Sequence, residues 1–376
     1  MLNSKTGKKG TRGRKGPNLA AEFRHLSWLE ACKGARFNLG SSSVLTLSLG
    51  EVGPLDPGQQ VGAANPAGDP ELVDLISGIY GVEKDCIMIT NGAGEANSLV
   101  AMTHVEKGSD VLVEKPVYQS LVEVSRFLGA RVVHFHRRHQ NGFGVDMEEL
   151  KCKITRRCRL VILSNLHNPS CAMLNAEQMR AISQIAADRG ATVLSDEVYL
   201  DCAGPLAPPP MAVLADNAVS TNSLSKAYGA GGFRMGWMLA HPSLLRAVKR
   251  LRDHVTIAPN RLGEEVAKNL LRRRGEVLAR TLGITRANTD VMGKWVGARD
   301  DVEWARPPAG TVCFPRILKR TPTVDIAIQY YEKENGLVCP GEFFGAAGHF
   351  RIGLGGRTDM MAPSLEALGR VLEGAV

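Results

Sequence analysis

Short, continuously apolar runs alternate with helical stretches through the middle of the chain, from about residue 70 to residue 221. The runs are too short for helices and lie between polar, glycine and proline residues, which is typical of buried strands. Strands are predicted at 86–90, 111–113, 131–135, 160–164, 191–195 and 217–221, and the first two helices at 71–80 and from the following glycine turn through residue 105. This alternation predicts a mainly parallel sheet that is covered on both faces and binds ligands at the carboxyl ends of its strands.

The two ends of the chain have weaker patterns. Before residue 70, the spacing of apolar residues predicts a helix within 20–40 and a short strand at 44–49, followed by an irregular loop at 54–68. After residue 221, we expect a strand at 235–240, a helix from residue 242, a long basic helical region at 261–296, and strands at 302–305, 311–315 and 350–353.

These patterns divide the chain into four predicted segments. They are a disordered basic tail at 1–17, an N-terminal arm with part of a small domain at 18–60, a large domain at 61–260, and a connecting helix with the rest of the small domain at 261–376.

Composition narrows the class of protein. A chain of 376 residues that is 44% hydrophobic can bury a large core, and no apolar run approaches the roughly 20 residues that span a bilayer. The eight cysteines are scattered, without a CxxC pair or a spacing with histidine that indicates a metal site. Reduced thiols in the cytoplasm fit this arrangement better than a disulfide framework.

The net charge of +8 is concentrated at the N-terminus. Residues 1–17 carry six lysines and arginines and no acidic residue, so the remainder of the chain contributes only +2. A tail of this composition is expected to be disordered. A weak contact with nucleic acid or another acidic surface is one interpretation of it, and a solvated leader without a binding role is the favoured one.

The candidate chemistry is concentrated after the strand predicted at 217–221. Ser223 and Ser225 precede Lys226, and Arg234 follows eight residues after the lysine. A lysine can form an imine with a carbonyl group, and hydroxyls with a guanidinium can bind a dianionic phosphate. Pyridoxal phosphate carries both groups. For this stretch taken alone, a solvated lysine in a plain loop is an equal alternative.

Other motifs follow the predicted strands. Gly92, Ala93 and Gly94 open a helix, where free backbone N–H groups and the helix dipole favour an anion. Tyr118 has an aromatic ring that can stack on another ring, and Asp196 can pair with a pyridine nitrogen and keep it protonated. Taken singly, a common glycine turn, a half-buried tyrosine and a helix-capping aspartate are the ordinary alternatives.

The run Ser223-x-Ser225-Lys226, followed by Arg234, resembles the lysine motif of the class I and II aminotransferases, which are fold-type I enzymes that depend on pyridoxal phosphate. The motifs match in order from about Gly50 to Arg351. The resemblance implies a three-layer α/β/α large domain with a mainly parallel sheet, a smaller α/β domain built from both ends of the chain, and a homodimer with active sites at the subunit interface.

The resemblance also implies roles for single residues. Lys226 would hold the cofactor as an internal imine, while its phosphate would be bound by Gly92, Ala93, Gly94, Ser223, Ser225 and Arg234. The cofactor ring would contact Tyr118, Asn168, Asp196 and Tyr199, with Asn168 and Tyr199 donating hydrogen bonds to its phenolic oxygen.

Substrate binding is implied in the same way. Arg351 would hold the α-carboxylate as a bidentate fork, with Gly50 and Asn168 beside it. Two positions depart from the family pattern. Cys171 stands where the Asn-Pro motif usually has a glycine, and Ala63 stands where many relatives carry a tyrosine that reaches the phosphate bound to the other subunit.

The predicted reaction is a transamination between an amino acid and a 2-oxo acid. The amino acid would displace Lys226, and the neutral lysine would then move the α-proton as general base and acid. Two alternatives remain. One is another pyridoxal phosphate reaction, such as elimination, cyclisation or lyase cleavage, and the other, less favoured, is a regulatory protein that binds the cofactor without turnover.

Overall fold

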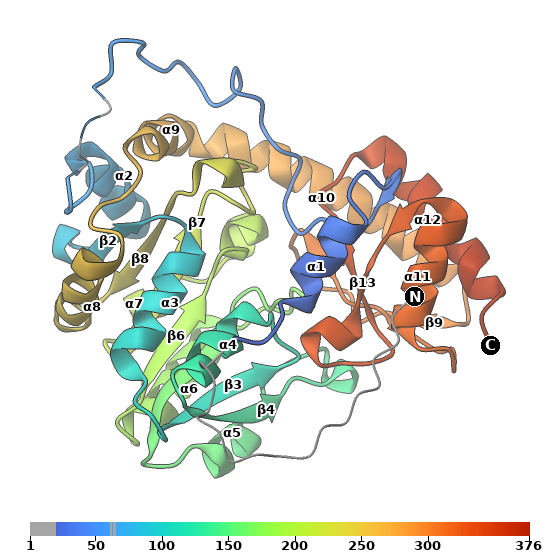
Figure 1. The fold of residues 1–376 in the computed structure, drawn as a ribbon, viewed down its shortest axis with the longest axis horizontal. Helices are drawn as coiled ribbons and strands as arrows, with labels where there is room; N and C mark the ends of the chain where they lie inside the picture. Colours follow the sequence, from blue (N-terminus) through green and yellow to red (C-terminus); the bar gives the residue numbers. More distant parts are fainter. Residues whose placement is uncertain (1–19, 61, 63–64) are drawn as a thin grey trace, which may run out of the picture.

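The computed structural model describes residues 20–60, 62 and 65–376. The tail predicted at 1–17 and the departure at Ala63 lie outside these residues. Figure 1 shows a large domain built around one sheet and a small domain formed mainly by the C-terminal part of the chain. The residue bounds proposed above for the two domains stay a prediction. No helix in the described ranges combines the length and the apolar character needed to cross a membrane.

Seven strands form the sheet of the large domain, in the order β2-β8-β7-β6-β5-β3-β4. β8 is antiparallel to its neighbours β2 and β7, and every other pair is parallel, so the mainly parallel sheet predicted from the apolar runs is confirmed. The strands are β2 (Ile87–Thr90), β3 (Asp110–Lys115), β4 (Arg131–His136), β5 (Cys158–Ser164), β6 (Thr192–Asp196), β7 (Ala218–Ser223) and β8 (Gly236–Ala240).

Both faces of this sheet are covered by helices. In β3, Val111 and Val113 pack in one cluster with α3, α4 and α8, whereas Leu112 between them packs with α5, α6 and α7 on the other face. This double burial explains why Val111, Leu112 and Val113 are all apolar, without the alternation of a strand buried on one face. The helices are α3 (Ala93–His104), α4 (Ser120–Phe127), α5 (Met147–Lys153), α6 (Ala176–Ala187), α7 (Met211–Leu214) and α8 (Pro242–Val255).

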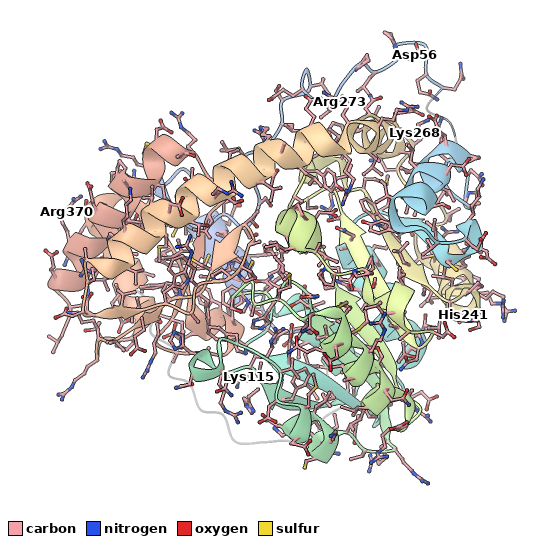
Figure 2. All side chains as sticks on the ribbon, turned by 180° about the vertical axis from the view of Figure 1, so that it is seen from behind. Asp56, Lys115, His241, Lys268, Arg273 and Arg370 are labelled. Carbon is pink, nitrogen blue, oxygen red and sulfur yellow. The ribbon has the colours of Figure 1, made fainter. Side chains whose placement is uncertain are left out.

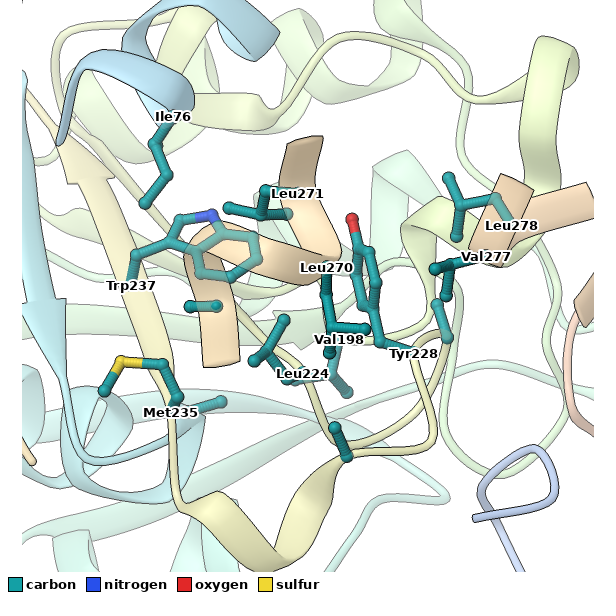
Figure 3. Close-up of a cluster of buried hydrophobic side chains, with 14 of the residues drawn as sticks. Ile76, Val198, Leu224, Tyr228, Met235, Trp237, Leu270, Leu271, Val277 and Leu278 are labelled. Atoms are coloured by element: carbon teal, nitrogen blue, oxygen red, sulfur yellow. The ribbon is translucent and has the colours of Figure 1, made fainter. Parts of the chain in front are cut away.

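A further apolar cluster holds the loop that carries Lys226. Figure 3 shows Leu224 and Tyr228, which flank the lysine in sequence, packed near Trp237 of β8 and Leu270 of α9 (Arg261–Arg272). All four of these side chains are buried. The backbone on both sides of the lysine is therefore fixed by the core, and α2 (Pro70–Tyr80) closes the same cluster.

Helix α10 (Arg274–Gly297) runs from the large domain into the small one (Figure 1). The helical region predicted at 261–296 is therefore two helices, α9 and α10, because Arg273 between them has φ −103° and ψ 23°. The small domain also contains α11 (Thr323–Glu334), α12 (Thr358–Glu373) and the short strands β9 (Val302–Glu303), β10 (Val312–Cys313), β11 (Arg316–Ile317), β12 (Gly336–Leu337), β13 (Cys339–Pro340) and β14 (Phe350–Gly353).

The N-terminal segment joins the small domain through helix α1 (Arg24–Ala31) and strand β1 (Phe37–Asn38), which pairs in parallel with β12. The strand predicted at 44–49 is wrong, because no strand forms there. Val44 N instead donates to the carbonyl oxygen of Lys226 (3.1 Å) and Leu45 N to that of Gly355 (2.8 Å). These single bonds to different segments tie the arm to the lysine loop without forming a ladder.

Candidate active site

Lys226 lies on the loop that follows β7, and its side chain is partly buried. Its Nζ donates to Ser42 Oγ (2.9 Å) and lies 5.9 Å from the centre of the Tyr199 ring. Burial, followed by the Arg351 charge, lowers the pKa of Lys226 to about 8, and the Asp196 carboxylate opposes both effects. At pH 7 roughly one-tenth of this amine is therefore neutral, far more than for an ordinary lysine.

Asp196 lies at the carboxyl end of β6 and is buried. Its Oδ2 accepts from Asn97 Nδ2 (2.8 Å) and its Oδ1 from Val198 N (3.2 Å). Asn97 Oδ1 in turn accepts from Thr221 Oγ1 of β7 (2.7 Å). Burial raises the pKa of Asp196, whereas these two donors and Lys226 lower it. The amide of Asn97 thus fixes the orientation of the carboxylate and favours its ionised form.

Gly92 and Arg234 approach each other closely. Gly92 precedes helix α3 with φ +89°, and a Cβ atom there would lie only 2.6 Å from Arg234 Nη2. The backbone conformation therefore favours glycine, and any side chain there would displace the guanidinium from its present position. Arg234 lines a pocket of about 300 Å³ together with Ser225 and Lys226, and Ser225 N donates to Ser223 Oγ (3.3 Å). The turn at 92–94 thus lies beside the lysine loop, in an arrangement that would suit an anion.

Asn168 lies in the turn after β5. Its backbone N donates to Ser164 Oγ (2.9 Å), and this hydroxyl donates to the buried Glu114 (2.5 Å). Cys171, which stands in place of the expected glycine, has φ +55°. The turn therefore keeps a left-handed residue at this position even though a side chain makes that conformation less favourable.

Arg351 lies on β14 with its side chain buried against the N-terminal segment. Its Nη2 lies 2.8 Å from His25 Nε2 and donates to Gly40 O (3.1 Å), whereas its Nε and Nη1 have no hydrogen-bond partner in the described part of the chain. Burial and the Arg351 charge lower the pKa of His25 to about 2. His25 is thus neutral, accepts at Nε2 and carries its hydrogen at Nδ1, which also lacks a partner within these residues.

The remaining expected residues are placed as follows. Tyr118 is partly buried, with its ring 5.8 Å from that of His25 and 5.2 Å from that of Phe23. Gly50 lies in an exposed turn, whereas the backbone oxygen beside Arg351 belongs to Gly40. The expected place of Gly50 next to a substrate carboxylate is therefore not supported by these contacts.

Three residues of the site were missed from sequence. No role for Asn97 follows from the sequence motifs. Its position, one helical turn into α3 at the edge of the sheet, is nevertheless a signal that its polar side chain has a partner there. Ser42 lies in a plain Ser-Ser-Ser run, and His25 contacts Arg351 across 326 positions of sequence. Neither of the last two has a local pattern that points to the site.

Pyridoxal phosphate fits this set of residues. Lys226 can capture an aldehyde, the turn at Gly92 with Arg234 suits a phosphate, and Asp196 suits a protonated ring nitrogen. Within the described residues, several buried polar atoms around them have no hydrogen-bond partner, namely Tyr199 Oη, Asn168 Oδ1, and Nε and Nη1 of Arg351. Buried polar atoms of this kind are normally satisfied, so a polar ligand accounts for them.

The fold and the site define a fold-type I enzyme that depends on pyridoxal phosphate. The sequence model described as "Aminotransferase class I and II" matches residues 58–368, and the chain belongs to this family. Capreomycidine synthase of Streptomyces vinaceus is 28% identical over 333 residues, which is 85% of each chain.

Solved structures agree with this assignment. A pyridoxal phosphate-dependent aminotransferase from Streptococcus suis has a TM-score of 0.90 and 27% identity, covering 94% of this chain and 98% of its own. The pyridoxal phosphate-dependent cyclase OrfR has a TM-score of 0.84 and 25% identity, covering 98% and 100%. The cofactor is therefore pyridoxal phosphate. The similar proteins are named for different reactions, because one is an aminotransferase, one a synthase and one a cyclase.

Proposed function

We propose that the protein is an aminotransferase that moves an amino group between an amino acid and a 2-oxo acid. The observation that carries this proposal is the pairing of Lys226, whose pKa is lowered to about 8, with the buried and partly unsatisfied Arg351. Transamination requires one group that moves a proton at the α-carbon and another that holds the α-carboxylate. These two side chains supply both functions.

When bound, the cofactor supplies an aldehyde that captures the amino group and a ring that withdraws electrons from the α-carbon. Lys226 in its neutral form would take the α-proton and, as the resulting acid, would donate it to the cofactor carbon that carried the aldehyde. Asp196, oriented by Asn97, pairs with the ring nitrogen, and Tyr199 and Asn168 donate to the phenolic oxygen. Arg351 would bind the carboxylate through its unpartnered guanidinium N–H groups and so orient the substrate relative to the lysine amine.

Cyclisation of an amino acid is the second candidate. It is supported by the resemblance to a protein named capreomycidine synthase and to the cyclase OrfR. It is also supported by His25, because a neutral imidazole with a free N–H beside the carboxylate site is a second group that can hold a proton. Ring closure within one substrate needs proton transfers at atoms other than the α-carbon. Lys226 acts at the α-carbon, so a second group such as His25 is needed for them.

We also propose that the protein is a homodimer whose second subunit covers the side of the active site where Arg234 lies. Arg234 is exposed in the single chain, and three large apolar residues nearby in sequence, Val255, Ile257 and Leu262, are 50%, 65% and 41% exposed. Asn260 in this segment donates through its backbone to Asn91 beside the glycine turn (2.8 Å). Light scattering of the purified protein tests the proposal, and a monomer at micromolar concentration would refute it.

The reaction is tested by adding single amino acids to the purified holoenzyme without an oxo acid. An aminotransferase converts the visible absorption band of the bound cofactor to that of its amine form and releases one 2-oxo acid per site, detected by mass spectrometry. A cyclase keeps the cofactor form through repeated turnovers and releases a product that retains the amino group. A Lys226→Ala variant should do neither, and a matched Lys294→Ala variant on α10 should behave as wild type.

A regulatory protein gives a third result in the same experiment. It would bind the cofactor and show neither a change of its absorption band nor a product with any amino acid. That outcome would exclude both enzymatic candidates.

A further inference from the structure

A second pocket, of about 240 Å³, lies where the large and small domains meet. One wall comes from the large domain, from Lys115 at the end of β3 and from the segment after β4 that contains Arg137. The other comes from the small domain, from Arg316 of β11 and from His349 just before β14. Figure 2 shows Lys115 at this meeting of the domains. We call it the junction pocket, and its lining includes none of the residues assigned above to the cofactor or substrate.

The lining of the junction pocket is strongly basic. It holds four lysines and arginines and three histidines but no acidic residue, and these side chains are Lys115, Arg137, Arg138, Arg316, His136, His139 and His349. The three arginines are each paired with a single carboxylate, at 2.9 to 3.2 Å, from Glu114, Glu149 and Glu303. Lys115 has no ion pair in the described part of the chain, so the pocket keeps an excess of positive charge.

Several polar atoms of the lining also lack partners. Arg137 is 2% exposed, and its Nη1 and Nε are bound to Glu114 and to Phe143 O, but its Nη2 has no hydrogen-bond partner within the described residues. Nε2 of His139 is likewise buried without one, whereas Nε2 of His349 is the accepting nitrogen of a neutral ring whose Nδ1 donates to Ala347 O. A buried guanidinium N–H left unsatisfied is unfavourable, so a ligand that accepts from it relieves this cost.

We propose that the junction pocket binds a small phosphate-type dianion that bridges the two domains. Guanidinium and ammonium groups bind phosphate through charge-assisted hydrogen bonds, and donors that arrive from several directions suit a tetrahedral anion better than a planar carboxylate. Lys115 and Arg137 contact it from the large domain, and Arg316 contacts it from the small domain.

The junction pocket is also connected to the active site. Pro116, in its wall, accepts a hydrogen bond at its carbonyl oxygen from His167 Nε2 (2.9 Å). His167 directly precedes Asn168, and the backbone carbonyl of His167 accepts from Cys171 N (2.6 Å). An anion that fixes Pro116 relative to the small domain therefore also restrains the turn that carries Asn168.

The test is calorimetric titration of the holoenzyme with inorganic phosphate at constant ionic strength, because bound cofactor already fills the site of its own phosphate. The double variant Lys115→Gln/Arg316→Gln is compared with Lys333→Gln/Arg370→Gln, which makes the same charge change and also removes an exposed ion pair, that of Arg370 with Glu334. Figure 2 places Arg370 on the small domain, far from Lys115. We expect at least about tenfold weaker phosphate binding in the first variant and no change in the second.

Three outcomes would overturn the proposal: no phosphate binding at millimolar concentration, equal weakening in both double variants, or acetate binding as tightly as phosphate. The single variant Lys115→Gln repeats the test if the double variant loses its cofactor band. A parallel titration with glycerol phosphate distinguishes a phosphorylated metabolite from free inorganic phosphate as the ligand. Tighter binding of the ester indicates a phosphorylated metabolite, and tighter binding of inorganic phosphate indicates the free ion.

Discussion

Replacing Lys226 with methionine should stabilise the apoprotein at neutral pH. The amine is held where burial and the Arg351 charge lower its pKa from 10.5 to about 8. Below about pH 8 the lysine is protonated in the folded and the unfolded chain, so the folded state bears the full cost of a buried charge. Between about pH 8 and pH 10.5 only the unfolded chain binds this proton, so wild-type stability rises with pH, and above pH 10.5 the cost is gone.

The size of the effect follows from the difference of 2.5 between those pKa values. At about 1.4 kcal/mol per pKa unit, the cost is about 3 kcal/mol at pH 7 and about 2 kcal/mol at pH 9. Methionine also loses the hydrogen bond from Nζ to Ser42, which offsets about 1 kcal/mol. The Lys226→Met apoprotein should therefore be about 2 kcal/mol more stable than wild type at pH 7, and slightly less stable above pH 10.5.

The assay is urea denaturation of both apoproteins at several pH values between about 7 and 10.5, with the free energy of unfolding taken from each curve. Lys294→Met, an exposed lysine on α10, serves as the control and should show no such crossover. The reasoning is refuted if Lys226→Met is no more stable than wild type at pH 7. It is also refuted if the difference between them does not fall as the pH rises.

Two further predictions concern the groups around the lysine. Arg351→Lys should lower kcat/KM for the amino acid substrate roughly 30- to 1,000-fold, which corresponds to about 2 to 4 kcal/mol, because an ammonium cannot copy the bidentate fork. Steady-state kinetics with an unchanged cofactor spectrum would show this loss. Asn97→Ala removes the bonds to Asp196 and Thr221 and should weaken cofactor affinity about tenfold by fluorescence titration. The control Thr103→Ala, on the same helix, loses only a bond to Leu99 O and should leave the affinity unchanged.

The large domain could be predicted because several of its strands, such as β3 and β5, are buried on both faces. That burial makes each of them contain a short apolar run, which is visible without knowledge of the neighbouring strands. The direction of β8 could not be predicted, because an apolar run has the same pattern in a parallel and an antiparallel strand. The prediction of a strand at 44–49 was wrong for a related reason. Its alternating apolar residues resemble a strand, but Leu49 is 65% exposed and the backbone bonds go to separate segments.

The residues of the candidate site also fall into those that could be predicted from sequence and those that could not. Gly92, Asp196 and Lys226 follow strands and form local motifs, so sequence alone indicated where they would meet. His25, in contrast, comes from a helix that the chain folds back onto Arg351, and only the folded structure shows that its imidazole is buried and neutral. Residues that position a site through a tertiary contact leave no periodic pattern, so the sequence carries no signal for them.

The charge balance of the site shows what must keep Lys226 neutral during the reaction. In the protein alone, the Arg351 and Arg234 charges both lower the pKa of Lys226, and Asp196 raises it. A substrate carboxylate on Arg351 and a phosphate beside Arg234 would cancel these two positive charges, so their effect on the lysine would largely disappear when it is needed. Burial is the largest of the causes, and it does not depend on what is bound. The segment from Ser42 to Val44, which contacts both the amine and the backbone of Lys226, is one of the parts of the chain that surround this lysine.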